Sequence, residues 1–325
     1  MKILVAGGAG YIGSCTVEYL LEKGHEVAVY DALLNGHRAA VDSRAKFFYG
    51  NLADMDELNR VMMDFQPEGV IHFAAFIEVG ESMKDPGKYF TNNVGNAIKL
   101  AEASARAKVR KLVFSSTAAV YGTPETVPID EEMPKSPINP YGRSKLMFEQ
   151  VLDWYQKIYG MQYTALRYFN AAGATRFHGE DHHPETHLIP LVIQAAMGVR
   201  PSISIFGTDY PTSDRTCIRD YVHVLDLAQA HLLALEKDGS DAFNLGSGKG
   251  YSVRQVIDTV RQVSGKEFAV KEEAPRAGDP AELIADSSKA KRLLGWKPQY
   301  DNLETIVRSA WEWRQEHPNG YGDKS

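Results

Sequence analysis

The chain begins with Met1-Lys2-Ile3-Leu4-Val5-Ala6-Gly7-Gly8-Ala9-Gly10-Tyr11-Ile12-Gly13, an apolar run followed by glycines in the spacing G-x-x-G-x-x-G. The run predicts a buried strand, and the pattern from Ile12 to Lys23 predicts a helix. Between strand and helix, Gly7 permits a tight turn, Gly10 lets a pyrophosphate approach the backbone, and Gly13 lets the helix pack closely on the sheet. The N–H groups at the helix start attract phosphates. This stretch therefore predicts a dinucleotide site.

An acidic residue at the end of the second predicted strand favours one dinucleotide over the other. That strand, residues 25–31, ends with Asp31, at the distance from the glycine loop that a ribose 2′-hydroxyl acceptor requires. A carboxylate there repels a 2′-phosphate, so we expect NAD and not NADP as the cofactor. Arg38 lies close enough in sequence to accept a 2′-phosphate, but Asp31 outweighs it.

Strands and helices continue to alternate after this start. Short strands rich in Val, Ile and Phe are predicted at residues 45–50, 69–75, 111–117 and 162–169, and helices at 55–65, 92–108 and 141–158. This alternation predicts an α/β fold, a Rossmann-type doubly wound parallel sheet with helices on both faces. Such sheets bind ligands at the carboxyl ends of their strands.

The character of the sequence changes after Phe169, where polar loops interrupt further short elements. We interpret this part as a smaller C-terminal substrate-binding lobe. The predicted division is residues 1–169 plus about 219–245 for the NAD-binding domain, and 170–218 plus 246–325 for the lobe that binds a nucleotide sugar.

Composition excludes several classes of function. The chain has 325 residues, a net charge of −6 and no basic cluster, which argues against nucleic acid as a partner. It has no apolar run long enough to cross a membrane, and the N-terminal run is too short for a signal peptide. The two cysteines, Cys15 and Cys217, fit a reducing cytoplasm, which is the expected location.

The predicted chemistry lies in Asn139-Pro140-Tyr141-Gly142-Arg143-Ser144-Lys145. Asn-Pro is a helix-start signal, so Tyr141 and Lys145 fall on the same helix face. Thr117 ends a predicted strand at the edge where this helix begins. The same Tyr-x-x-x-Lys spacing occurs at Tyr19 and Lys23, but no strand-end hydroxyl precedes that pair.

These groups can work together as an acid–base unit. Tyr141 as a phenolate takes a proton from a substrate alcohol, Thr117 shares or relays the proton, and a hydride moves to the nicotinamide. A phenol has a pKa of ~10, so action near neutrality needs a shift of about 3 units. We expect the ammonium group of Lys145 to supply much of this shift, and a cationic cofactor ring the remainder.

The glycine loop, Ser115-Ser116-Thr117 and Tyr141-x-x-x-Lys145 together resemble the extended short-chain dehydrogenase/reductase family. Further stretches narrow the resemblance to the UDP-glucose (UDP-galactose) 4-epimerases. They include Phe73-Ala74-Ala75, Asn92-Asn93-Val94, Arg167-Tyr168-Phe169-Asn170, Arg219-Asp220-Tyr221-Val222-His223 and Pro275-Arg276-Ala277-Gly278-Asp279-Pro280. The resemblance runs from residue 1 to about residue 322. It implies an enzyme that keeps its NAD and oxidises the sugar at C4. The oxidised sugar then rotates in the site and is reduced on its other face.

The resemblance also implies a set of site residues. The catalytic ones are Thr117, Tyr141 and Lys145. The residues expected to bind the cofactor are Gly7, Gly10, Tyr11, Ile12, Gly13, Asp31, Asn51, Leu52, Phe73, Ala74, Ala75, Asn93, Ser115, Tyr141, Lys145 and Tyr168. Those expected to bind the substrate are Thr117, Tyr141, Phe169, Asn170, His187, Leu188, Ile205, Phe206, Arg219, Tyr221, Arg276 and Asp279. Of these, Arg219 and Arg276 can fork onto phosphate oxygens, and Asp279 can accept from a ribose hydroxyl or orient Arg276.

The chain departs from the family pattern at several positions. Asn51 replaces an Asp, Ala32 an Asn, and Ile77 a Lys that commonly approaches the cofactor phosphates. Arg215 stands where Gly is usual, and it carries strain if that position needs a positive φ. Leu283 is smaller than the Tyr of strict glucose/galactose forms, which suggests a side activity on UDP-N-acetylhexosamines.

Residues 178–187, His-Gly-Glu-Asp-His-His-Pro-Glu-Thr-His, contain several possible metal ligands. No spacing places them on one helix face and the chemistry needs no metal, so we expect a substrate-lobe loop without a metal site.

Other functions of the same scaffold stay open. A dehydratase would need an acid pair after Thr117, where Ala118 and Ala119 stand. A nucleotide-sugar decarboxylase, a pentose epimerase and a non-catalytic NAD-binding sensor are further alternatives. As a partner we expect a second copy of the chain, bound through the helices at 92–108 and 141–158.

Overall fold

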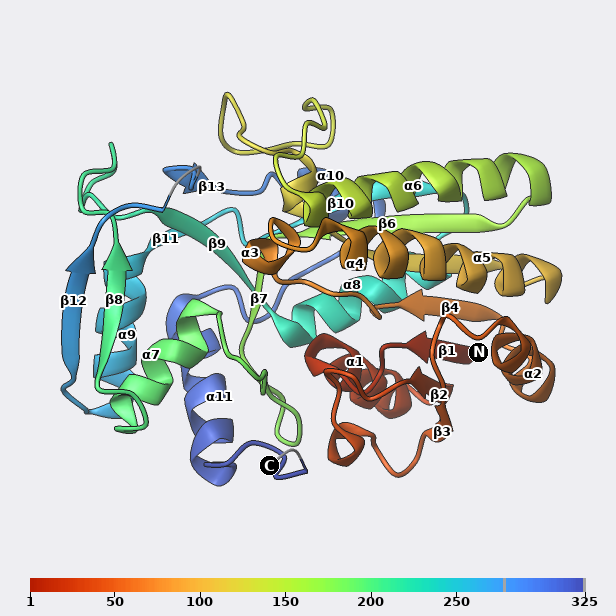
Figure 1. The fold of residues 1–325 in the computed structure, drawn as a ribbon, viewed down its shortest axis with the longest axis horizontal. Coiled ribbons are helices and arrows are strands. Elements are labelled where there is room, and N and C mark those ends of the chain that lie inside the picture. Colours follow the sequence, from red (N-terminus) through yellow and green to blue (C-terminus); the bar gives the residue numbers. More distant parts are fainter. Residues whose placement is uncertain (277–278, 324–325) are drawn as a thin grey trace.

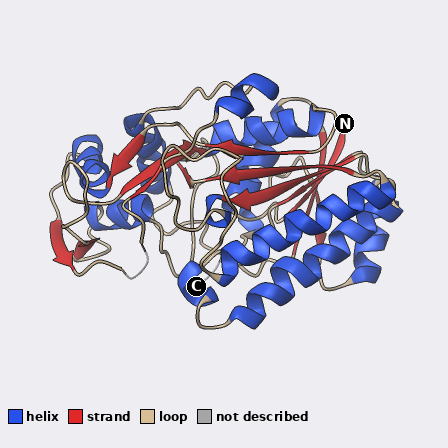
Figure 2. Cartoon of the chain, turned by 90° about the horizontal axis from the view of Figure 1, so that it is seen from above, coloured by secondary structure: helices blue, strands red, loops and turns tan. Residues whose placement is uncertain are grey.

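The computed structural model describes residues 1–276 and 279–323 and shows a large sheet covered by helices, with a smaller lobe at one end (Figures 1 and 2). The first part of the chain forms β1 (Lys2–Ala6), α1 (Tyr11–Glu22), β2 (Glu26–Asp31), η1 (Arg38–Ala40), β3 (Lys46–Tyr49), α2 (Met55–Phe65), β4 (Gly69–His72), α3 (Val79–Ser82), α4 (Pro86–Phe90), the π-helical turn η2 (Thr91–Asn96), α5 (Ala97–Arg106), β5 (Lys111–Thr117), η3 (Ala118–Val120), α6 (Pro140–Tyr159) and β6 (Gln162–Tyr168).

The second part supplies the lobe and the last strand of the large sheet. Its elements are β7 (Asn170–Ala172), α7 (Leu188–Ala196), β8 (Ser202–Phe206), β9 (Ile218–His223), α8 (Val224–Glu236), β10 (Asp241–Leu245), β11 (Gly250–Ser252), α9 (Val253–Ser264), β12 (Ala269–Glu273), β13 (Glu282–Leu283), α10 (Ser288–Leu293) and α11 (Leu303–Glu316). The lobe therefore begins with the residues that directly follow β6.

The large sheet has seven parallel strands in the order β10-β6-β5-β4-β1-β2-β3. The predicted doubly wound α/β fold is confirmed. Strand order reverses between β1 and β4, and a ligand binds in such a sheet outside the carboxyl ends at this reversal. The glycine loop follows β1 directly, so the N-terminal stretch lies where the topology places the ligand.

Both faces of the sheet are buried, which explains why its strands read as continuous apolar runs. Along β1, Ile3 and Val5 pack in the core that α1 and α8 cover, whereas Leu4 packs in the core under α2, α5 and α6. Figure 1 shows α5 and α6 side by side along the outer surface of the sheet.

Most strands of the lobe were not predicted from the sequence; the exception is β8, which was expected at residues 201–206. A four-stranded sheet joins β11, β9 and β13, with β7 paired to β9, and β8 pairs with β12. These strands have two to six residues, too short for a periodicity signal. The expected helix at 92–108 is also divided, because residues 91–96 form a π-helical turn before α5 begins.

Candidate active site

The glycine loop has the geometry of a dinucleotide site, and each of its three glycines has a different structural role. Gly7 has φ +84°, and a Cβ there would lie 2.4 Å from the Ala74 backbone nitrogen. A Cβ at Gly13 would lie 2.2 Å from the Gly7 carbonyl oxygen. At Gly10, in contrast, a Cβ would meet only one backbone oxygen, at 3.5 Å, so the protein itself leaves room there. That room, at the N-terminus of α1, suits the close approach of a pyrophosphate.

Two loops meet at the strand-order reversal. Phe73 and Ala74, which follow β4, both donate their backbone N–H groups to the carbonyl oxygen of Ala6, at 2.8 and 3.1 Å. Ala75 follows them. The segment predicted to face the cofactor is thereby fixed against the end of β1, beside Gly7.

Asp31 is held at the edge of the glycine loop. Its Oδ2 accepts from the Ala9 N–H at 3.0 Å and its Oδ1 from the Leu33 N–H at 2.8 Å. A carboxylate can accept further hydrogen bonds beyond one on each oxygen, so this arrangement orients the group for a ribose. Asn51 uses its side-chain oxygen on the Ala53 N–H, at 2.9 Å, and Leu52 is buried beside it.

The helix that carries Tyr141 begins as the sequence predicted. Asn139 caps α6 by accepting from the Gly142 N–H at 2.8 Å, and Pro140 takes the first helical position. A Cβ at Gly142 would lie 2.5 Å from the Ala119 carbonyl oxygen, so only glycine permits this approach. The close approach brings Tyr141 to the end of β5, where Thr117 interacts with the phenol and also caps η3.

Lys145 lies under the phenol rather than bonded to it. Its Nζ is 5.9 Å from the centre of the Tyr141 ring and donates to the Ser115 carbonyl oxygen at 2.8 Å. Only 2% of the side chain surface is exposed, and burial lowers the pKa of Lys145 to about 7, although Glu149 acts to raise it. Burial therefore makes the uncharged amine accessible near neutral pH.

The expectation that Lys145 lowers the pKa of the phenol is wrong for the protein alone. Burial raises the pKa of Tyr141 above its ordinary value, Glu78 adds to this, and Thr117 opposes it. The reason is that burial disfavours the charged forms of both groups, so the phenol and the amine each remain closer to neutral.

Three residues expected to bind the cofactor are held by buried contacts. The Ser115 hydroxyl is bonded to the Tyr168 hydroxyl on the neighbouring strand. Asn93, in the π-helical turn, binds both the N–H and the carbonyl of Phe76 at 2.9 Å. A π-helical turn inside a helix often marks a functional site.

A buried ion pair beneath Lys145 was missed by the sequence reasoning. Arg167 forks onto Glu149, with contacts of 3.0 and 2.5 Å, and also donates to the Tyr121 hydroxyl at 3.0 Å. Ser116 contacts Glu149 from β5. Each partner is polar and isolated in sequence, so only the packing of α6 on β5 and β6 shows that they meet.

The predicted substrate residues continue from the sheet edge into the lobe. Phe169 and Leu283 both pack against the apolar cluster of Val120, Tyr121, Ile129 and Leu146, just beyond Thr117. Leu283 is the strand neighbour of Arg219. The hydroxyl of Thr117, this apolar cluster and the guanidinium group of Arg219 therefore lie one after another along the site.

Charged groups in the lobe are paired differently from the sequence prediction. The Asp279 carboxylate contacts Arg219, which also donates to the carbonyl oxygens of Ile218 and Pro280 at 2.8 and 2.9 Å, whereas the Asp279 backbone N–H donates to the Arg276 carbonyl oxygen at 3.3 Å. Arg276 instead lies over the Phe206 ring, 4.1 Å from its centre. Asp279 thus orients the other arginine, because the segment that leads into β13 passes beside β9.

The remaining lobe residues lie on the same short strands. Asn170 pairs in register with Tyr221 and donates from Nδ2 to the Asp220 carbonyl oxygen at 2.8 Å. Tyr221 and Ile205 are buried. Phe206 ends β8 and is half-buried.

His187 belongs to a different group from the arginines. It caps the start of α7 before Leu188, and its Nδ1 lies 2.8 Å from Glu180 Oε1. Tyr11 of the glycine loop reaches the same loop, because its hydroxyl donates to the Gly173 carbonyl oxygen at 2.5 Å. The sequence predicted a loop without a metal site at residues 178–187, and this irregular loop brings four possible metal ligands together.

Arg215 is strained as predicted. Its φ is +65°, in the left-handed region that favours glycine. The side chain is exposed. Ile77, at the other doubtful position, is half-buried next to Phe76.

Within residues 1–276 and 279–323, no helix is both long and apolar enough to cross a membrane.

Comparison with known proteins gives concordant results. The family model "NAD dependent epimerase/dehydratase family" matches residues 3–246. The UDP-glucose 4-epimerase of Lacticaseibacillus casei is 51% identical, with all of both chains covered. A UDP-glucose 4-epimerase from Brucella ovis, solved with NAD, is 45% identical with a TM-score of 0.94 over 96% of this chain and 97% of that one.

The name of a third similar protein includes two sugars, Glc and GlcNAc. The UDP-Glc/GlcNAc 4-epimerase of Campylobacter jejuni is 44% identical, with a TM-score of 0.86 over 97% of this chain and 99% of that one. A family model that covers most of the chain, and relatives of this identity at full length, settle the family. The chain belongs to the NAD dependent epimerase/dehydratase family and, within it, to the UDP-glucose 4-epimerases.

Proposed function

We propose that this protein interconverts UDP-glucose and UDP-galactose by reversible oxidation and reduction at C4 of the sugar, with NAD held throughout. The observation that carries the proposal is the meeting of Thr117, Tyr141 and Lys145 at the carboxyl edge of the sheet, beside the glycine loop. The fit of the glycine loop and Asp31 to a dinucleotide supports NAD as the cofactor.

The chain's own groups supply binding and proton transfer, and bound NAD supplies the exchange of a hydride with the sugar carbon. Tyr141 takes the proton of the C4 hydroxyl and returns it after the oxidised sugar has rotated in the site. Thr117 shares that proton. Because Lys145 is buried and has a pKa of about 7, it can be protonated when the Tyr141 phenolate forms and lose that charge when the phenol is neutral.

The UDP anchor of this proposal is in the lobe. Arg219 is supported by Asp279 and by two carbonyl oxygens, which leaves its guanidinium plane fixed for a phosphate oxygen. Arg276, Tyr221, Asn170, Ile205, Phe206, His187 and Leu188 complete the proposed substrate set. A firm diphosphate anchor with a roomy sugar pocket suits an enzyme whose oxidised sugar must rotate between the two hydride transfers.

The sugar range is part of the proposal. Leu283 and Phe169 both pack against the apolar wall beyond Thr117, where a larger side chain than Leu283 would fill space next to the sugar. We therefore propose turnover of UDP-N-acetylhexosamines as a side activity. The broader name of the Campylobacter jejuni relative supports this.

A second copy of the chain is the proposed partner. On α6, Met147, Trp154 and Ile158 are exposed, with Trp154 and Ile158 at 62% and 66%, and Val151 lies between them at helical spacing. An apolar stripe of this kind suits a helix-to-helix interface. We also propose a cytoplasmic location, which rests on two free, buried cysteines.

The domain division also stays a proposal. It assigns residues 1–169 and about 219–245 to NAD binding and the remainder to the lobe. Its support is that the seven-stranded sheet takes β10 from the second part of the chain, and that α8 packs with α1 on one face.

The test uses the pure protein without added NAD. It is mixed with UDP-galactose, and the appearance of UDP-glucose is followed, with UDP-GlcNAc in a parallel reaction. We expect UDP-glucose without any added oxidant. A 4-keto-6-deoxy product would indicate a dehydratase, loss of carbon dioxide from a uronic acid substrate a decarboxylase, and binding of NAD with no product of any kind the sensor.

A further inference from the structure

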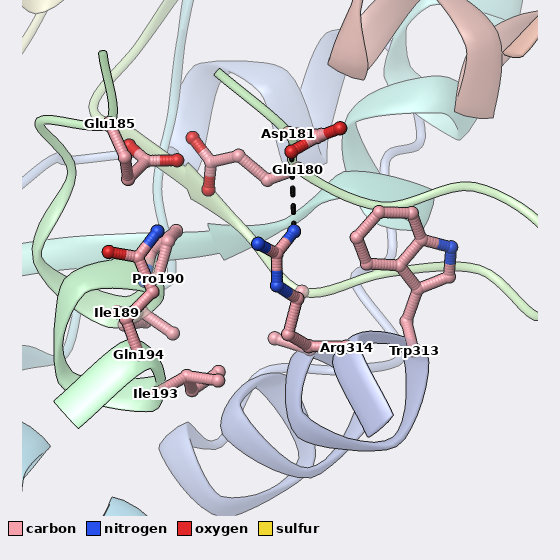
Figure 3. A pocket seen from close by; sticks show the side chains of 11 residues that line it. Glu180, Asp181, Glu185, Ile189, Pro190, Ile193, Gln194, Trp313 and Arg314 are labelled. Carbon is pink, nitrogen blue, oxygen red and sulfur yellow. Dashed lines mark hydrogen bonds and ion pairs between the residues drawn. The ribbon is translucent and has the colours of Figure 1, made fainter. Parts of the chain in front are cut away.

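The loop before α7 gathers a cluster of which only His187 belongs to the proposed substrate set. Glu180, His182, Glu185 and His187 each offer one ligand atom, and these atoms all lie within 4.8 Å of one another. The carboxylates are almost fully buried, with 8% of the Glu180 side chain and 6% of the Glu185 side chain exposed. Figure 3 shows the two carboxyl groups turned toward each other beside α7.

The distances in this cluster match the edges of a small polyhedron. Glu180 Oε1 lies 3.3 Å from His182 Nδ1 and 2.8 Å from His187 Nδ1. Glu185 lies 3.3 Å from His187 Nδ1 and 3.9 Å from His182 Nδ1. Ligands at about 2.0–2.1 Å from a tetrahedral zinc ion are about 3.3 Å apart, so the contacts scatter around that edge.

The hydrogen bonding of the two imidazoles is a second observation. The Nδ1 atoms of His182 and His187 are fully buried, and neither makes a hydrogen bond, although carboxylate oxygens lie close to both. Buried polar atoms normally have a partner, so these nitrogens need an explanation. A bound cation would supply the partner that both nitrogens lack.

The charged neighbours of the two carboxylates are the histidines of the cluster itself. Among residues 1–276 and 279–323, neither Glu180 nor Glu185 is paired with Lys or Arg. The intervening Asp181 turns away and binds Arg314 at 3.2 Å, as Figure 3 shows. Glu185 is oriented by the backbone N–H groups of Thr186 and His187, at 2.7 and 2.8 Å, in the manner of groups that support metal ligands.

We propose that these four residues form a structural zinc site. Two imidazoles and two carboxylates suit Zn²⁺, and two carboxylates balance its charge. Four protein ligands close the site, which is typical of zinc that holds a fold and not of zinc that binds substrate. This proposal replaces the expectation of no metal, which rested on helix spacing and on chemistry that needs no metal.

The position of the site indicates what the zinc ion would hold. The loop is tied to α1 by His178 and Glu18, with His178 Nδ1 2.6 Å from Glu18 Oε2. Tyr11 packs edge-on against His182, with ring centres 6.3 Å apart. His187 is followed at once by α7. The ion therefore joins the glycine-loop region to the first helix of the lobe.

The test uses full-length protein without a histidine tag, loaded with zinc and then desalted. We expect about one zinc ion per chain by mass spectrometry, and a fall of about 4 °C or more in the thermal midpoint when a chelator removes it. The Glu180→Gln and His182→Gln variants should retain less than about a tenth of the metal. The control is His183→Gln, in the same loop but 57% exposed, which should bind zinc like the wild type.

A second measurement does not depend on whether the variants fold. X-ray absorption at the zinc edge of the wild type should show two imidazole nitrogens and two oxygens at about 2.0–2.2 Å and no sulfur. The proposal is overturned if the loaded wild type keeps no zinc after desalting, if the folded variants keep as much as the wild type, or if the spectrum shows sulfur from Cys15 or Cys217.

Discussion

Two tyrosine–lysine pairs in this molecule have the same spacing but different surroundings. Lys23 lies 5.3 Å from the centre of the Tyr19 ring on α1, and Lys145 lies 5.9 Å from that of Tyr141 on α6. Lys23 is exposed, whereas Lys145 is buried and bonded to the Ser115 carbonyl oxygen. The same motif thus produces an ordinary surface pair in one place and a candidate catalytic pair in the other.

The surroundings of the two phenols explain the difference. Burial raises the pKa of both, but Tyr19 contacts Gln229 on the covered face of α1 and Tyr141 contacts Thr117 at the open edge of the sheet. A proton acceptor must reach its substrate, so position at the strand ends matters more than the distance to an ammonium group. The following predictions test this contrast.

The largest effect is expected from the phenol itself. Tyr141→Phe should lower kcat by about 10³-fold or more, since a positioned acid–base group contributes about 10²–10⁴-fold. Tyr19→Phe should leave kcat within about twofold, because its ring is packed against α8 and not at the sheet edge. The measurement is steady-state epimerisation of UDP-galactose by both variants. Equal activity in wild type and Tyr141→Phe would remove Tyr141 from the mechanism.

The lysines come next. Lys145→Met should lower kcat by about 10²-fold and weaken NAD retention, because a buried amine beneath the phenol is lost. Lys23→Met should change neither quantity. Retained NAD is measured by releasing it from the denatured protein. If both variants behave alike, the burial of Lys145 has no functional meaning.

The strand-end hydroxyl that distinguishes the two pairs should have a smaller effect. Thr117→Val removes the hydroxyl at constant volume and should lower kcat by about 10-fold to 10²-fold, whereas Thr117→Ser should keep most of the activity. Because Thr117 also caps η3, the thermal midpoints of both variants are measured beside their kinetics. A fully active Thr117→Val would show that Tyr141 needs no neighbouring hydroxyl.

The smallest effect concerns stability and pH. Burial lowers the pKa of Lys145 from 10.5 to about 7, so the unfolded chain binds more protons than the folded one between these values. The free energy of unfolding of the NAD-free protein should therefore rise with pH in this window, by up to about 1.4 kcal/mol per pH unit for one group.

Urea unfolding at several pH values checks this slope. Lys145→Met should reduce it, while Lys23→Met should leave it unchanged, since Lys23 is exposed in the folded protein as well. An unchanged slope in Lys145→Met would mean that the amine keeps its ordinary pKa on folding.

The large sheet was predictable because its signals are local. The strands β1 and β5 and the helix α2 have the bounds expected from their apolar patterns. The helix cap at Asn139 was also predictable from its local sequence. The positive φ of Arg215 was expected from the family resemblance, because Gly is usual at that position. The short strands of the lobe gave no such signal, since β13 has two residues and β7 three.

The sequence by itself determined the class of the protein. The glycine loop, Asp31 and the order of strands and helices follow from backbone sterics and from burial of both sheet faces, and these act through neighbouring residues. The choice of Tyr141 over Tyr19 also came from position along the chain relative to strand ends.

Only the tertiary structure decided the electrostatics. The raised pKa of Tyr141, the lowered pKa of Lys145, the pairing of Asp279 with Arg219, and the cluster from Glu180 to His187 depend on burial and on contacts between distant or irregular segments. The physical reason is that the cost of a buried charge is set by everything packed around it, which no spacing along the chain records.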